Sequence, residues 1–197
     1  MKLKAIIQIF LALGILVLIY FIYAGIMSPV KFNNEMTSRK DIVIQKMKDI
    51  RTIQSMYMTL NGKYCSTFDS LITFVEEGEM PVVKLTARPG DSTFTDPIRD
   101  TIDFISIKDS LFGKRPDFKL ENIAHIPFSN FENAPYDNFE MKVDVVKKGN
   151  VPVNVIEVFA ANKYYLKGLD LEKNNIDPED GLRFGSLTDP STDGNWE

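Results

Sequence analysis

The chain has 197 residues, and its 23 Lys plus Arg face 27 Asp plus Glu. This acidic balance argues against a nucleic-acid partner, because binding phosphates needs a concentrated basic face. The single cysteine, Cys65, excludes an intrachain disulfide. The length suffices for one membrane anchor and one folded domain with its own core.

The first element in the chain is an apolar segment, residues 5–27, that contains no charged residue. At about 1.5 Å per helical residue it reaches roughly 35 Å, which exceeds a hydrocarbon layer of about 30 Å. We therefore predict a transmembrane helix over residues 5–27. A cleaved signal peptide is the alternative, but such peptides have an apolar core of only about 7 to 15 residues, and Tyr23 disrupts the small-residue exit pattern.

Basic residues lie on both sides of the span, so their count does not decide its orientation. Long domains cross a membrane with little regard to such charges, and we choose the orientation on that basis. We expect residues 1–4 to form a cytoplasmic tail. The rest of the chain is then an extracytoplasmic domain, which the span anchors in a bacterial-type inner membrane.

An amphipathic helix is predicted over residues 28–62. Pro29 removes a backbone donor, and we expect a kink or short break there. Apolar residues then recur at three- and four-residue steps from Met36 to Leu60, and Gly62 suits the left-handed position after the last turn. This helix is expected to complete a domain over residues 63–197.

The rest of that domain is predicted to be mainly β. Ser66 or Thr67 can cap a short helix that stops near Gly78. Lys148-Gly149-Asn150 is a hairpin turn signal, and a short helix is expected over residues 161–169. Two polar stretches, 86–100 and 128–138, are expected to be surface loops. Period-two or β-branched runs predict strands at residues 82–85, 102–107, 122–127, 139–146 and 151–159. The predicted fold class is α+β: a transmembrane helix continuing into a long amphipathic helix packed on an antiparallel sheet.

Two segments resemble known proteins. Residues 49–64, DIRTIQSMYMTLNGKY, close the first helix with Asn61-Gly62-Lys63-Tyr64, and residues 185–196, GSLTDPSTDGNW, form a Gly- and Asp-rich ending. Together with the helix order of the first 75 residues, they resemble type IV pilins and the pseudopilins of type II secretion. The resemblance implies a rod-like first helix, half of it in the membrane and half packed on a sheet. Family precursors carry a cleavage glycine and a docking glutamate. Gln8 is the nearest residue to that acid here, so we expect a permanent anchor.

Carboxylates in the tail are the candidate metal ligands. Hard oxygen ligands on a flexible loop suit Ca²⁺, and the resemblance to major pseudopilins implies calcium in the tail. Their spacing matches no EF-hand loop, and solvated acidic turns are the alternative. His125 lacks a partner for metal or base chemistry, and Cys65 is expected to be a small buried residue. The predicted ligands are Asp177, Asp180, Asp189 and Asp193.

Two functions fit this sequence. The first is a non-enzymatic structural or assembly component of an envelope secretion or surface-assembly complex, whose partners are the membrane and other envelope proteins or further copies of the chain. The second is a membrane-tethered module that binds a protein, peptide or glycan through loops 86–100 and 128–138. No catalytic motif was identified, and no cofactor other than calcium is expected.

Overall fold

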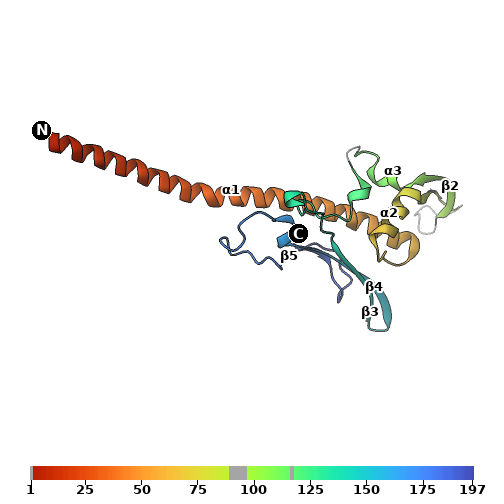
Figure 1. Cartoon of the computed structure of the whole chain (residues 1–197). Coiled ribbons are helices and arrows are strands. Elements are labelled where there is room, and N and C mark those ends of the chain that lie inside the picture. Colours follow the sequence, from red (N-terminus) through yellow and green to blue (C-terminus); the bar gives the residue numbers. More distant parts are fainter. Residues whose placement is uncertain (1, 89–96, 116–117) are drawn as a thin grey trace.

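The computed structural model describes residues 2–88, 97–115 and 118–197, and its architecture is α+β. A single long helix, α1 (Lys2–Asn61), projects far beyond the rest of the molecule, and two small antiparallel sheets gather around its C-terminal end (Figure 1). The predicted single sheet is therefore wrong: the strands form two separate sheets.

Helix α1 changes character along its length. Its N-terminal half is apolar on every side and fully exposed, and it is long and apolar enough to cross a membrane. Its C-terminal half buries one stripe, which consists of Val43, Met47, Ile50 and Ile53. These residues recur at steps of three and four, so they lie on one face of the helix.

The predicted break at Pro29 is wrong, because α1 runs through this residue without interruption. A proline removes one hydrogen bond from the helical ladder, and the bonds on either side keep the helix continuous. The apolar half of α1 and the half that packs in the domain core are thus parts of one continuous helix. At the other end, Gly62 adopts the left-handed conformation (φ 71°), and its N–H donates to the carbonyl of Met58, as expected for a helix end.

After α1 the chain turns back through a short connection into α2 (Phe68–Glu77). Thr67 is the N-cap, as predicted: its hydroxyl accepts a hydrogen bond from the Ser70 N–H. The buried amide of Gln54 holds the connection to α1. Its Nε2 donates to the carbonyl of Cys65, and its Oε1 accepts from the N–H of Cys65, each at 2.9 Å.

The first sheet is a two-stranded ribbon of β1 (Glu79–Thr86) and β2 (Ile98–Ser106). A bulge shifts the register between Val82 and Val83. Helix α3 (Ile107–Phe112) follows β2 directly and replaces the predicted end of that strand at Ile107. Part of the predicted loop 86–100 lies outside the described residues.

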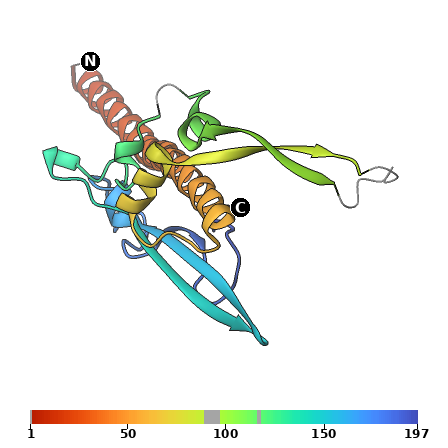
Figure 2. The same cartoon turned by 90° about the vertical axis from the view of Figure 1, so that its right-hand side faces the viewer.

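The second sheet has the order β3-β4-β5, formed by β3 (Glu140–Lys148), β4 (Val151–Ala161) and β5 (Gly181–Gly185). The predicted hairpin between β3 and β4 is confirmed, and Gly149 has the positive φ that its turn requires (63°). The ribbon and this hairpin extend away from α1 in different directions (Figure 2). Strand β5 lies in the tail, where no strand was predicted.

Three other predictions need correction or limits. Residues 122–127 are not a strand. Asn122 ends a short 3-10 helix, η1 (Leu120–Asn122), and residues 123–127 make only one bridge, between His125 and Asn138. Here Ile123 and Ile126 are buried three residues apart on successive turns, a spacing that the period-two interpretation missed. Helix α4 (Asn162–Tyr165) is shorter than the predicted 161–169. Loop 128–138 contains a second 3-10 segment, η2 (Phe131–Asn133).

One hydrophobic core joins these elements. The stripe on α1 shares it with side chains from α2, α3 and the three-stranded sheet, among them Leu71, Val75, Ile107, Ile156, Val158 and Phe184. The apolar half of α1 lies outside this core. Folding of the domain therefore depends on the second half of α1.

The Gln54 contact gives a first testable prediction. Replacing Gln54 by Leu should lower the free energy of unfolding by about 2 to 4 kcal/mol, because the buried N–H and carbonyl of Cys65 both lose their partner. The measurement is urea unfolding of the full chain in lipid nanodiscs, followed by the fluorescence of Trp196. Thr52→Ala, which removes an exposed hydrogen bond on the same helix, is the control. Equal effects of the two substitutions would contradict the structural role of Gln54.

Candidate functional site

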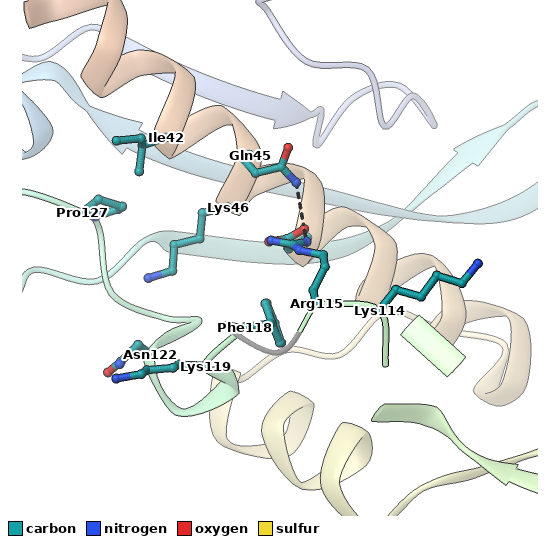
Figure 3. Close-up of a pocket in the computed structure, with 10 residues that line it drawn as sticks. Ile42, Gln45, Lys46, Lys114, Arg115, Phe118, Lys119, Asn122 and Pro127 are labelled. Atoms are coloured by element: carbon teal, nitrogen blue, oxygen red, sulfur yellow. Dashed lines mark hydrogen bonds and ion pairs between the residues drawn. The ribbon is translucent and has the colours of Figure 1, made fainter. Parts of the chain in front are cut away.

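A cavity of about 600 Å³ lies between α1 and the segment that follows α3 (Figure 3). Helix α1 contributes residues 42–49 and the other wall comes from residues 114–127. The lining contains one acidic residue, Asp49, and four basic ones, namely Lys46, Lys114, Arg115 and Lys119. The pocket thus concentrates positive charge in a chain whose formal net charge is −4.

An ion pair with two hydrogen bonds forms part of the wall of this pocket. Arg115 Nη1 and Nη2 donate to Asp49 Oδ1 and Oδ2 at 2.6 and 3.1 Å. Asp49 is only 7% exposed, and Gln45 also donates to its Oδ1 at 3.1 Å. The hydrogen bond to Asp49 raises the pKa of Arg115. The buried carboxylate is therefore satisfied by two partners, and it anchors Arg115 to α1.

Aromatic rings support the same arginine. The guanidinium of Arg115 lies 5.3 Å from the ring centroid of Phe118, and Phe118 stacks on the buried ring of Phe112. Cation–π contacts of this kind orient a guanidinium as well as stabilising it. The lining consequently combines an aromatic ring with basic side chains.

Lys46 lies one helical turn before Asp49, and its side chain points into the pocket. Its ammonium donates to the carbonyl of His125 at 2.6 Å. Burial lowers the pKa of Lys46 to about 8, and the nearby charge of Asp49 opposes that shift. A carbonyl is a neutral acceptor, so Lys46 carries its charge here without a directly paired carboxylate among the described residues.

The four predicted calcium ligands make separate contacts. Asp177 Oδ1 accepts from the N–H of Glu179 at 2.9 Å, and Asp193 Oδ2 accepts from the hydroxyl of Ser191 at 2.8 Å. Asp180 lies 3.9 Å from Arg183, and Asp189 pairs with Lys148 on the β3–β4 hairpin. Within the part of the chain that the structure describes, no three metal-ligating side chains converge. Calcium binding by the tail stays a prediction.

Cys65 and His125, the other two residues considered as candidates, both make contacts that stabilise the fold. Cys65 is buried, as predicted, and its thiol lies 3.3 Å from the carbonyl of Thr67. His125 Nδ1 lies 2.7 Å from Asn138 Oδ1, and the imidazole stacks on Tyr136. Through its carbonyl, His125 also positions Lys46 in the pocket.

Sequence reasoning missed this pocket. A local signal was present, since residues 114, 115 and 119 form a short basic cluster in an otherwise acidic chain. Lys46 and Asp49, however, lie between the apolar positions of the predicted helix, which are typical of a solvated face, and only folding brings them together with residues 114, 115 and 119. Comparisons with protein-family models, with curated proteins and with solved structures find no match to this chain.

The Asp49–Arg115 pair gives a second prediction. Arg115→Met should lower the free energy of unfolding by about 1 to 2 kcal/mol because it leaves a buried carboxylate with one donor. This is less than the roughly 3 to 5 kcal/mol of fully buried pairs, since Arg115 is half exposed. Urea unfolding in nanodiscs measures it. Lys142→Met, which breaks an exposed pair with Glu140, should have a much smaller effect; a similar loss in both variants would contradict the assignment.

Lys46 gives a third prediction, which concerns pH. The unfolded chain holds the Lys46 proton up to the ordinary pKa of 10.5, whereas the folded chain releases it near pH 8. The unfolded state therefore binds more protons between these values, and the stability of the wild type relative to Lys46→Met should rise as the pH increases from 8 to 10.5. Comparing unfolding of the two proteins across this range cancels the titration of shared tyrosines. A difference that does not vary with pH would refute the desolvation of Lys46.

Proposed function

We propose that this protein is a single-span, membrane-anchored, pilin-like assembly component that presents its domain to protein partners outside the cytoplasm. The continuity of α1 is the observation that carries this proposal. Its exposed apolar half can be covered by a bilayer, and its second half is part of the domain core. A domain built on the same helix as its anchor is held at a fixed place relative to the membrane.

The length of α1 sets that place. Residues 28–61 beyond the proposed span extend about 50 Å at roughly 1.5 Å per residue. The ribbon of β1 and β2 lies at this far end of the helix (Figure 1). Neighbouring copies anchored in one membrane would present their ribbons at the same height, an arrangement that favours lateral contact.

The ribbon also carries exposed apolar side chains on one side. The pairing places Val83 opposite Thr101, Leu85 opposite Arg99, and Pro81 opposite Phe104, so these residues share one side of the ribbon. Val83, Leu85 and Phe104 are 41%, 53% and 61% exposed. A two-stranded ribbon is only marginally stable by itself, and clustered exposed apolar side chains mark protein contacts. This face supports an assembly role.

We also propose which membrane holds the span and that the domain has a structural role. The span resides in a bacterial-type inner membrane with the N-terminus in the cytoplasm, the domain acts as a structural element of an envelope secretion or surface-assembly complex, and it performs no catalysis. The resemblance of residues 49–64 and 185–196 to pilins and pseudopilins favours a rod that contacts other rods. Partners are envelope proteins or further copies of this chain.

A tethered binding module is the second candidate, and the basic pocket is the observation that favours it. Site-specific photo-crosslinking in intact membranes separates the two functions. A crosslinker at Val83 or Phe104 should capture protein partners if the assembly role is right. Capture only from positions at the pocket rim, such as Lys119 or Pro127, would favour the binding module instead.

The ribbon face gives a fourth prediction. Leu85→Ser combined with Phe104→Ser should reduce the protein that copurifies with the tagged chain in mild detergent by at least about tenfold, because both side chains lose their apolar contact area. Val145→Ser, at an exposed apolar position on the other hairpin, is the control and should retain the partners. Unfolding midpoints verify that the domain stays folded. Undiminished copurification with the double variant would contradict the role of the ribbon.

A further inference from the structure

The basic pocket has more positive charge than its own acid can balance. Asp49 is engaged by Arg115 at two points, so the remaining lysines of the lining have no carboxylate of their own within ion-pair distance among the described residues. Lys46 and Lys119 lie on one side of the pocket together with Asn122, whereas Lys114 extends away from it (Figure 3). Two ammonium groups thus flank the cavity, and neither forms an ion pair with a carboxylate of the described residues.

Lys46 is held in a position to bind. One of its three N–H donors is used by the carbonyl of His125, which fixes the ammonium at the pocket wall and leaves two donors. Its lowered pKa fits an ammonium that is partly removed from water without a directly paired counterion. An anion beside Lys46 would supply that charge and restore hydrogen bonds that burial has removed.

Three side chains of the lining are apolar. Ile42, Phe118 and Pro127 contribute hydrophobic surface, and the volume of about 600 Å³ falls within the range of roughly 300 to 1,000 Å³ that is typical of small-ligand sites. A ligand that matches both the basic and the apolar side chains of the lining joins an anionic group to an apolar group about the size of an aromatic ring. The negative charge of Asp49, one helical turn from Lys46, favours a monoanion over a dianion.

We propose that this pocket binds an organic carboxylate, with the carboxylate between Lys46 and Lys119 and the apolar part of the ligand against Phe118. Lys46 lies 19 residues beyond Met27, or about 28 Å along α1, so the headgroups next to the proposed span are out of its reach. The carboxylate belongs either to a free small molecule or to a peptide. The proposal is independent of the assembly role and holds whether or not the ribbon binds a partner.

Calorimetric titration of the full chain in lipid nanodiscs tests it, with empty nanodiscs as the blank. The probe is 3-phenylpropionate, and 3-phenylpropanol, which has a similar shape without the charge, is its neutral counterpart. We expect the carboxylate to bind at least about tenfold more tightly than the alcohol, a difference of about 1.4 kcal/mol. Equal affinities for the carboxylate and the alcohol, or tighter binding of phenyl phosphate than of 3-phenylpropionate, would each overturn the proposal.

Variants locate the site. Lys46→Met and Lys119→Met should each weaken binding of 3-phenylpropionate at least about fivefold and leave the alcohol unchanged, because only the charged group loses a partner. Lys48→Met removes an equal charge two residues from Lys46 and outside the pocket lining, and it should have no effect. Lys119 is exposed, so its replacement keeps the test valid if Lys46→Met unfolds the domain. Unchanged binding in the Lys119 variant would place the carboxylate elsewhere and refute the proposed site.

A peptide arm distinguishes the two sources of the carboxylate. The probe is an acetylated tripeptide, Gly-Gly-Phe, with a free C-terminal carboxylate, and the same tripeptide as an amide is its control. Tighter binding of the acid than of both the amide and 3-phenylpropionate would support the proposal and assign the site to peptides. Binding of 3-phenylpropionate alone would support it and assign the site to small molecules. Failure of every carboxylate probe would refute it.

Discussion

Four side chains on one stripe of α1, Val43, Met47, Ile50 and Ile53, form the surface around which the rest of the domain packs. Each is fully buried, and each shares the core with α2, α3 and the three-stranded sheet. Burying such side chains contributes about 1.5 to 3 kcal/mol each, so the stripe supplies much of the apolar driving force. The sheets are small, and neither would be stable without the helix. The helix that is long and apolar enough to cross a membrane is in this way also the element that organises the fold.

Polar contacts on the same helix then determine where the connecting segments lie. Gln54 holds the chain as it leaves α1, Asp49 holds Arg115, and Lys46 holds the carbonyl of His125. All three side chains come from consecutive turns of α1. The pocket follows from this arrangement, because two of these contacts draw its opposite wall toward the helix and leave a basic cavity between them.

The sequence predicted the elements whose signals are local. The apolar span, the Thr67 cap and the Gly149 turn each depend on neighbouring residues, and each is present. Strand β5 was missed because its pairing is nonlocal: a side chain at Gly181 or Gly185 would collide with the carbonyls of Ala160 and Ile156 on β4. Those glycines belong to a close strand contact, although in sequence they are typical of turns.

The pocket was not predictable for a similar reason. Lys46 and Asp49 occupy positions that a helical pattern assigns to solvent, and their partners lie 79 and 66 residues further along the chain. The division of the strands into two sheets was not predictable either, because the local pattern of a strand does not say which other strand it pairs with. Residues 122–127 show the reverse error. Their local pattern suggested a strand, but no strand forms there, and Ile123 and Ile126 are buried three residues apart.

The unbroken course of α1 through Pro29 has a mechanical consequence. A stiff helix acts as a lever: if the proposed span tilts by about 20°, an ordinary angle for a membrane helix, a point 50 Å beyond it moves sideways by roughly 17 Å. The thickness of the surrounding bilayer influences that tilt. Through this lever the lipid composition of the membrane would set how far the ribbons of neighbouring copies stand from one another.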